Sequence, residues 1–324
     1  MNKAPVLVGI DIPWFDQLVR LEKMPRGNES VRILESSCQG GGKVSTALVA
    51  AARQGIPCKM IAVLGDGPRS RFLLDDFERH DIDVSDIYIK PGYREGYSVV
   101  LSDSQSGGRR ILWDYDDRSG GLTTDDIDRC GESISRAGFL HICRMDAVDR
   151  RAAEIARQAG TLVSFDADFY TPEIADNLSL IDILIGSEEF YGQCFPEGGD
   201  IRENIRTLIS GGLLTVIFTF GKRGCCGMAG ETFFEVPAFQ KNIDVVDTVG
   251  AGDVFHGAYL AGLCKGMGPE EAARFASAVS AIKCTGIGGR AAIPDYNTAV
   301  RYLKTGTFPA EELNRRILFY NKNI

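Results

Sequence analysis

The stretch Asp247-Thr248-Val249-Gly250-Ala251-Gly252-Asp253-Val254-Phe255-His256-Gly257-Ala258 follows an extended run over 233–246 and opens an apolar run that predicts a helix to about Lys265. Its small residues at 250–252 let the backbone turn tightly, with no side chain in the way. The amides of this turn would lie at a helix N-terminus, where free N–H groups and the helix dipole attract an anion. Asp253 follows on the first helical turn. A carboxylate beside an anion site is electrostatically unfavourable unless it has a function. The function that fits is to accept a proton from a hydroxyl that attacks phosphorus, so the pattern indicates phosphoryl transfer.

A glycine-rich turn capped by aspartates is common in α/β proteins, and a bare Gly-x-Gly-Asp would favour that structural interpretation. Two other Gly-Lys pairs do not complete a Walker A motif, because Val44 follows Lys43 and Arg223 follows Lys222. The run 286–291 matches the dinucleotide motif loosely, but too little chain follows it for a βαβ unit. None of these motifs competes with the twelve-residue stretch.

The whole twelve-residue stretch resembles the C-terminal signature of the ribokinase-like (PfkB) carbohydrate and nucleoside kinases. The resemblance implies that Asp253 is the catalytic base and that the amides of Gly250, Ala251 and Gly252 form an anion hole. It extends from Val6 to about Pro294, with weaker motifs toward the N-terminus. The runs that look closest to one branch, which includes sulfofructose kinase and many unassigned sugar kinases, are Val245–Asp247, Arg274–Ser277 and Gly288–Asp295.

The composition is that of an ordinary globular protein, with 324 residues, 44% hydrophobic and 25% charged. A net charge of −8 argues against non-specific nucleic-acid binding. Nine cysteines without a Cys-x-x-Cys pair, beside only three histidines, predict free thiols in a reducing compartment. No apolar run reaches the ~18 residues of a membrane span, and the N-terminus does not look like a signal peptide. We therefore expect a soluble, cytoplasmic protein.

Strand and helix patterns alternate along most of the chain, which predicts α/β architecture with a mainly parallel central sheet and helices on both faces. The predicted strands are 4–10, 59–64, 84–89, 139–143, 162–166, 183–185 and 214–219, and the predicted helices are 45–54, 70–80, 147–159 and 201–209.

Two polar, extended segments, 12–39 and 94–117, interrupt this alternation, the second with a hairpin-like turn over 102–108. Neither can bury a face alone, so we expect them to form one small β lid. The rest, 1–11, 40–93 and 118–324, would be the α/β domain that binds nucleotide and substrate. The resemblance implies a ribokinase-like fold of this design, in which the lid commonly forms the contact of a homodimer.

Gly40-Gly41-Gly42-Lys43 precedes a predicted helix, and such a run makes either a tight turn or a place where a ligand meets bare backbone. It resembles the family's sugar motif, which implies that Gly41, Gly42 and Lys43 bind substrate. Thr46 stands where the family often has Asn, and it is the expected counterpart for a sugar hydroxyl.

Asp16 lies where the family has a sugar-binding aspartate, and a carboxylate can accept two vicinal hydroxyls; Asp11 is the alternative. Arg144 follows a predicted strand end, a good position to hold an anionic group on a substrate. Surface charges or surface ion pairs are the competing interpretations for Asp16 and Arg144. Asp166 and Asp168 end another strand, where they would order sugar or metal, or cap the next turn.

The run Thr219–Gly224 resembles the family's nucleotide loop, which implies that Thr219, Gly221 and Gly224 bind the cofactor. Within the twelve-residue stretch, Asp247 and Thr248 are expected to do the same. Ser187 and Phe190 replace the family's Asn-x-x-Glu motif, so Glu188 and Glu189 are the metal candidates, through water, or else helix N-terminal acids.

ATP and Mg²⁺ are the expected cofactors, because phosphates need neutralising during transfer. The resemblance adds an adenine pocket near 272–283 and a K⁺ loop near 284–289, and Phe255 and His256 are expected to pack rather than react.

The sequence thus predicts an ATP-dependent kinase that phosphorylates a hydroxyl, expected to be primary, of a ketose or an acidic sugar. Fructose, fructose-6-phosphate, 2-keto-3-deoxygluconate and ribose stay open as substrates. A nucleoside is less favoured, because the lid shows no clear aromatic sandwich for a base. A non-catalytic sugar or nucleotide sensor on the same fold is the alternative, and the intact Asp253 counts against it. A nicotinamide dehydrogenase would need a glycine fingerprint that Val8–Asp11 does not supply.

Overall fold

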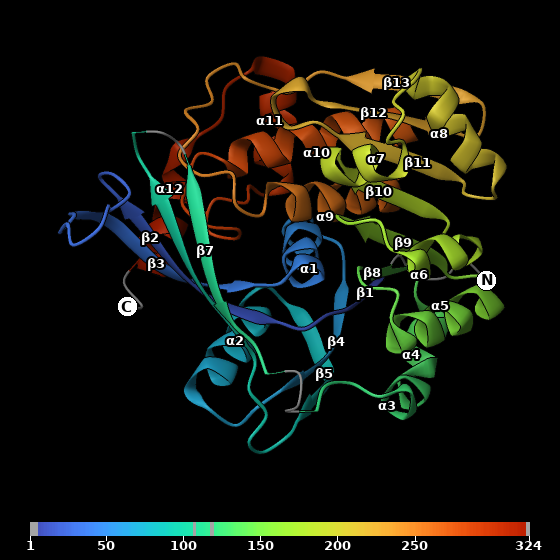
Figure 1. Cartoon of the computed structure of the whole chain (residues 1–324), viewed down its shortest axis with the longest axis horizontal. Helices are drawn as coiled ribbons and strands as arrows, with labels where there is room; N and C mark the ends of the chain where they lie inside the picture. Colours follow the sequence, from blue (N-terminus) through green and yellow to red (C-terminus); the bar gives the residue numbers. More distant parts are fainter. Residues whose placement is uncertain (1–5, 106–107, 117–119, 322–324) are drawn as a thin grey trace.

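The computed structural model describes residues 6–105, 108–116 and 120–321, which form two β-sheets and their covering helices (Figure 1). The larger sheet has nine strands and the smaller one has four. Across its width the larger sheet is built from β13 (Thr232–Val236), β12 (Cys225–Ala229), β11 (Thr215–Thr219), β10 (Ile183–Ser187), β9 (Leu162–Ala167), β8 (Phe139–Ile142), β1 (Leu7–Ile10), β4 (Cys58–Leu64) and β5 (Ile82–Ile89).

Neighbouring strands from β11 to β5 pair in parallel, and the pairs β11–β12 and β12–β13 at one edge are antiparallel. The predicted mainly parallel sheet is therefore confirmed. Parallel strands end at a common edge, and in α/β proteins ligands bind beside that edge. The run 233–246 is extended in a strand only as far as Val236, because Pro237 lacks the N–H that a further ladder bond needs.

Alternate residues of the strands pack into two separate cores, one on each face of the sheet. Leu7 and Ile183 point into the first core, and their neighbours Val8 and Leu184 point into the second. The first core is covered by α1 (Lys43–Arg53), α2 (Pro68–Arg79), α9 (Ala251–Cys264), α10 (Pro269–Lys283) and α11 (Tyr296–Thr305). The second is covered by α3 (Thr124–Arg129), α4 (Gly131–Arg136), α5 (Ala147–Ala159), α6 (Pro172–Asp176), α7 (Glu188–Cys194) and α8 (Ile201–Ser210).

The last helix, α12 (Ala310–Asn321), lies beside the small sheet, where Asn321 donates to the Glu35 carboxylate at 2.9 Å. In the described ranges, no helix combines the length and the apolar character that crossing a bilayer requires.

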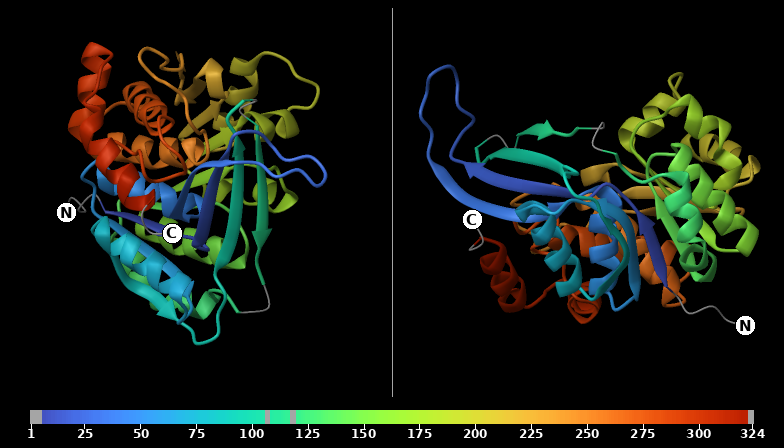
Figure 2. Two further views of the ribbon diagram at one scale, coloured as in Figure 1. Left: turned by 90° about the vertical axis from the view of Figure 1, so that its left-hand side faces the viewer. Right: turned by 90° about the horizontal axis from the view of Figure 1, so that it is seen from below.

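The small sheet extends outward from the larger body, and the loop between its first two strands projects beyond it (Figure 2). Its order is β3 (Ile33–Gly41), β2 (Trp14–Leu21), β6 (Gly96–Asp103) and β7 (Arg109–Asp114). The central pair β2–β6 is parallel, while the two outer pairs are antiparallel. The Asp103 amide donates to the Gly108 carbonyl at 2.9 Å at the base of the predicted turn, whose residues 106–107 lie outside the described residues.

The strands of the small sheet come from the two segments predicted to form a lid. The division into a lid of 12–39 and 94–117 and a domain of 1–11, 40–93 and 118–324 stays a prediction. Its residues 1–5, 117–119 and 322–324 lie outside the described part of the chain.

Helices α1 and α9 pack backbone against backbone at Gly257. A Cβ at this position would lie 1.9 Å from the carbonyl oxygen of Ala47, far inside van der Waals contact. A Cβ at Gly9 of β1 would lie 2.5 Å from Val44 Cγ1 and 2.9 Å from Leu48 Cδ1 of α1. These glycines let the two helices lie against each other and against the sheet, so both helices begin at the carboxyl edge of the strands.

Replacing Gly257 by Ala tests this contact. The added methyl group has to displace helix backbone, so we expect a loss of about 1–3 kcal/mol in the free energy of unfolding, measured by urea titration. Gly192→Ala in α7 is the matched control, since no atom lies within 4 Å of a Cβ there. A Gly257→Ala protein as stable as the Gly192→Ala protein would contradict the packing argument.

Candidate active site

Four strands deliver polar residues to one edge of the large sheet. Asp11 follows β1, Arg144 follows β8, Asp166 and Asp168 end β9, and Thr219 ends β11. These strands are adjacent or nearly so in the sheet order, so residues as far as 208 positions apart in the sequence lie along one edge of the sheet.

Helix α9 begins at this edge with a left-handed residue. Gly250 has φ 74 and ψ 6, and a Cβ there would lie 2.8 Å from the Gly289 Cα. The Ala251 amide donates to the Thr248 carbonyl at 3.2 Å, so the turn itself uses one of the three amides predicted for the anion hole. In the described part of the chain, the amides of Gly250, Gly252 and Asp253 donate no hydrogen bond, and Gly252 faces open space. These donors remain for an anion.

The Asp253 carboxyl lies on the first turn of α9, among other acidic groups. Burial raises its pKa well above the usual range, and the negative charges of Asp166, Asp168 and Asp11 raise it further, while Lys43 opposes them. A carboxylate whose pKa is raised in this way is a stronger base than a free one. Such a group suits the proton acceptor that the sequence predicts.

Lys43 is the cation among these acids. It begins α1, forms an ion pair with Asp168, and lies 3.9 Å from Asp166 Oδ1. Burial lowers the pKa of Lys43, but the two aspartates raise it further, so the ammonium keeps its charge. Burial likewise raises the pKa of Asp166 to about 6, with Lys43 opposing the rise and Asp168 adding to it. The structure thus brings together Lys43, the two strand-end aspartates and Asp253.

The triple glycine before Lys43 makes room for carboxylates. A Cβ at Gly41 would lie 2.1 Å from Asp16 Oδ2, and one at Gly42, where φ is 92, would lie 2.7 Å from Asp11 Oδ2. Asp11 accepts a hydrogen bond from the Ser45 amide at 2.8 Å and so caps α1, whereas Asp16 accepts one from Ser98 Oγ at 2.7 Å. Asp11 therefore has a structural use at the helix start, and Asp16 keeps one oxygen without such a bond.

Arg290, which the sequence did not single out, holds the glycine turn from behind. Its buried guanidinium donates to Asp76 Oδ2 at 2.7 Å and to the Gly41 carbonyl at 2.8 Å. Gln39 Oε1 accepts from the backbone amides of Arg290 and Ala291 at 2.8 and 3.1 Å. Because these partners come from distant parts of the sequence, no local sequence pattern predicts their contacts.

Two predicted substrate residues have partners within the protein. Thr46 is buried, and its Oγ1 lies 3.5 Å from Arg290 Nε. The Arg144 guanidinium lies 3.0 Å from Asp146, 3.6 Å from Asp149 and 3.7 Å from Asp11. Both roles stay predictions, but three carboxylates already share the charge of Arg144.

The predicted cofactor residues fall into two groups. Thr219 ends β11 at the sheet edge, Gly221 begins the short 3-10 helix Gly221–Arg223 that follows, and Thr248 is exposed before α9. At Gly224 and Asp247, contacts within the protein already require a glycine and an aspartate. A Cβ at Gly224 would lie 2.1 Å from the Val236 carbonyl oxygen, and the Asp247 carboxylate accepts from the Val249 and Gly288 amides at 3.0 and 2.8 Å.

The metal candidates Glu188 and Glu189 begin α7. Glu188 pairs with Arg223 at 2.7 Å between two exposed side chains, and Glu189 lies 3.5 Å from Gln193. The structure thus supplies a helix N-terminus and surface partners for both acids, and their metal role stays a prediction.

A protein-family model described as pfkB family carbohydrate kinase matches residues 8–295. The chain belongs to the pfkB family. This pfkB protein is 24% identical over 302 residues to the ribokinase of Staphylococcus aureus strain COL, across 90% of its own length and 97% of that relative. It is 24% identical over 311 residues to a nucleoside kinase of Methanothermobacter thermautotrophicus, across 93% and 96%. The Arabidopsis thaliana ribokinase structure, complexed with ribose and ATP, aligns with a TM-score of 0.78 at 23% identity, across 93% and 99% of the two chains.

These comparisons confirm the ribokinase-like fold and the enzyme class, a phosphotransferase of the carbohydrate kinases. The relatives include both a ribokinase and a nucleoside kinase, so they leave the acceptor of this pfkB protein undetermined.

Breaking the Arg290–Asp76 pair tests the support of the glycine turn. Arg290→Met leaves Asp76 Oδ2 without its buried guanidinium, while Tyr320 and Arg79 still bond Oδ1, so we expect the free energy of unfolding to fall by about 3–5 kcal/mol in urea titrations. The double variant Arg290→Met/Asp76→Leu removes both charges and should recover part of this loss. Arg136→Met is the control, because its pair with Glu132 is solvent-exposed, and it should leave stability nearly unchanged. An Arg290→Met protein as stable as this control would contradict the role of Arg290.

Proposed function

We propose that this pfkB protein transfers the γ-phosphoryl group of ATP to a hydroxyl, most suitably a primary one, of a ketose or an acidic sugar. The observation that carries the proposal is Asp253 on the first turn of α9, near the Lys43 ammonium and next to amides that make no hydrogen bond to any described residue. Phosphoryl transfer to an alcohol requires a base, an anion site and a fixed cation close to one another.

In the proposed reaction Asp253 accepts the proton of the attacking hydroxyl while the oxygen attacks the γ-phosphorus in line. The amides of Gly250 and Gly252 hold the charge that develops on the transferred group. Asp16 and the Gly41–Gly42 backbone orient the sugar, and the small sheet closes over it to keep water from the phosphoryl group. Lys43 keeps its charge and faces the acids around the reacting atoms.

ATP and Mg²⁺ are the proposed cofactors. The exposed amides at the start of α9 suit phosphate oxygens, and Thr219, Gly221 and Thr248 lie along the same edge for the rest of the nucleotide. Glu188 and Glu189 would hold magnesium through water, and the ion would neutralise the phosphate charge during transfer. A K⁺ ion in the 284–289 loop belongs to the same proposal.

For the acceptor, the sulfofructose kinase branch that the sequence resembles points to an acidic ketose, with Arg144 as the group that meets the acid. The ion pairs of Arg144 with three aspartates weigh against this role and favour a neutral sugar. Fructokinase, 2-keto-3-deoxygluconate kinase and ribokinase specificities are therefore the alternatives. A non-catalytic sensor would need no base and is the alternative from another class.

A homodimer through the small sheet is the proposed assembly. The side chains of β7 are exposed, and Ile111, Leu112 and Trp113 are 51%, 56% and 69% exposed. An exposed apolar edge strand is a typical site of pairing with another chain. Free thiols at the cysteines suit a reducing compartment, and we propose the cytoplasm.

Asp253→Asn removes the proposed base with little change in shape. We expect kcat to fall by about 10²–10⁴-fold, the usual contribution of general-base catalysis, while ATP binding changes little. ADP release and ATP binding by calorimetry are the measurements. Asp244→Asn, at an exposed position, carries the same charge change and should keep full activity. Near-normal turnover in the Asp253→Asn protein would refute the assignment.

A panel of neutral and acidic sugars, assayed with the native protein and with Arg144→Gln, tests the substrate class. If Arg144 meets an acid group, its loss should raise KM for acidic sugars by at least about 10-fold and leave neutral sugars nearly unchanged. An equal change in KM for acidic and neutral sugars would show that Arg144 pairs with its three aspartates and does not bind an acid group of the substrate. Absence of sugar-dependent ADP release with every sugar, with ATP still bound, would favour the sensor.

A further inference from the structure

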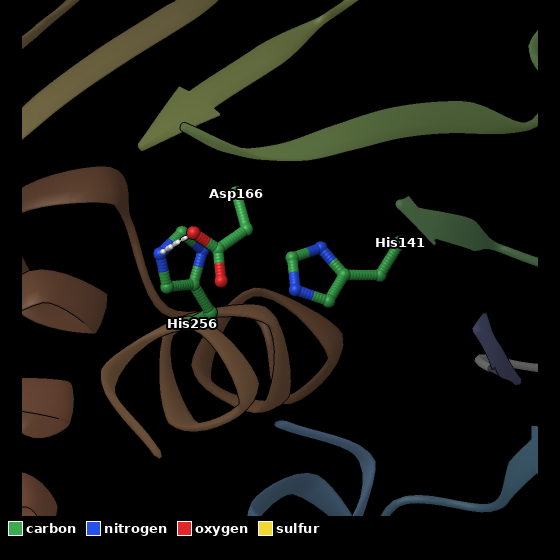
Figure 3. A group of neighbouring side chains, drawn as sticks. All are labelled: His141, Asp166 and His256. Atoms are coloured by element: carbon green, nitrogen blue, oxygen red, sulfur yellow. Dashed lines mark ion pairs between the residues drawn. The ribbon is translucent and has the colours of Figure 1, made fainter. Parts of the chain in front are cut away.

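Two histidines and an aspartate from three different elements converge in the buried interior of the protein. His141 is on β8, Asp166 on β9 and His256 on α9, and all three side chains are buried. One nitrogen or oxygen from each lies within 4.8 Å of the others. Figure 3 shows the Asp166 carboxylate against the His256 ring, with a ring nitrogen of His141 turned toward Asp166.

Each of the three side chains carries a buried polar atom without a partner. Among the described residues, His141 Nε2, Asp166 Oδ2 and His256 Nδ1 make no hydrogen bond. Buried polar atoms are nearly always paired, because leaving one unpaired costs the full price of its desolvation. Three such atoms in one cluster indicate that something else belongs between them.

The tautomer of His141 is the one that a metal ligand has. Its Nδ1 lies 3.3 Å from the Ser164 carbonyl oxygen, which can only accept, so the proton is on Nδ1 and the lone pair is on Nε2. Histidines that bind metals usually donate their second N–H to a carbonyl or carboxylate in this manner. The lone pair of His141 thus points into the cluster.

We propose that His141, Asp166 and His256 bind one divalent transition-metal ion of the zinc type. Two imidazoles and one carboxylate are a ligand set of such ions, and they leave a further position for water. Magnesium prefers oxygen ligands and fits this set poorly. The ligand atoms have to draw together to bring each within about 2.0–2.2 Å of an ion.

Lys43 is the cation that competes for Asp166, and it approaches the other side of the carboxylate. It lies 3.9 Å from Oδ1, and its closer partner is Asp168. His256 Nε2 is also 3.5 Å from Oδ1, too long for a strong hydrogen bond. Asp166 Oδ2 is therefore the oxygen available to the metal.

The position of the site gives it a structural consequence. His256 is three residues after Asp253 on α9, so the two side chains lie on one face of the helix. An ion held by His256, Asp166 and His141 would tie the first turns of α9 to β9 and β8. It would act as a positioning element for the base, separate from the Mg²⁺ that accompanies ATP.

Cobalt is the probe for the test, since Co²⁺ occupies zinc sites and absorbs visible light there. The full-length protein, freed of metal with a chelator, is titrated with Co²⁺ without ATP and with Mg²⁺ in excess. We expect the d–d bands of a four- or five-coordinate ion, saturating at one equivalent, and a rise in the melting temperature when Zn²⁺ is added. These readouts do not depend on kinase activity, so they are independent of the proposed function.

His141→Gln and His256→Gln should each weaken Co²⁺ binding by more than about 100-fold, since loss of an outer-shell partner alone costs about 10–100-fold. His80→Gln is the matched control, because His80 is buried and bonded to Tyr320 at 3.0 Å, outside the cluster, and it should keep the bands. Circular dichroism checks that each variant is folded.

Two outcomes with the native protein and one with a variant would overturn the proposal. The absence of saturable d–d bands would do so, and so would an intense thiolate charge-transfer band, which would assign the ion to cysteines. Bands that survive unchanged in a folded His141→Gln protein would overturn it as well.

Discussion

The close contact between α1 and α9 is the constraint on which the active site depends. At Gly257 the two backbones meet with no space for a side chain, and the Ala47 carbonyl fills the place of a Cβ. Both helices therefore start at the carboxyl edge of the sheet. One start presents Lys43, and the other presents the free amides and Asp253. The cation, the proposed anion site and the proposed base are thus positioned by packing inside the core rather than by flexible loops.

The same edge gathers more negative charge than stability alone would favour. Asp166, Asp168 and Asp11 all raise the pKa of Asp253, and only Lys43 lowers it among the causes that dominate. Groups that repel one another persist at sites where function needs them, and the base and phosphate site that we propose here would have such a need. The negative charge of these acids also favours cations at this edge of the sheet, such as the Lys43 ammonium or the metal ion proposed above.

The small sheet is joined to this arrangement through its root. Gly41 ends β3 against the Asp16 carboxylate, and Arg290 binds the Gly41 carbonyl from the opposite side. Arg290 in turn is paired with Asp76 of α2 inside the core. The end of β3 that faces the predicted sugar-binding aspartate of β2 is therefore held by a buried ion pair, while the loop between β2 and β3 projects away from the body (Figure 2).

The sequence by itself determined the α/β alternation, the glycine turn before α9 and the candidate base, because periodicity and turn chemistry are local properties of the chain. The predicted helix 147–159 coincides with α5, and α9 begins within the quoted stretch. Only the tertiary structure decided which side chains meet. The Arg290–Asp76 pair joins residues 214 positions apart, and the His141–Asp166–His256 cluster brings His256 to two residues that lie 115 and 90 positions before it. Such contacts arise from sheet order and helix packing, which no local pattern encodes.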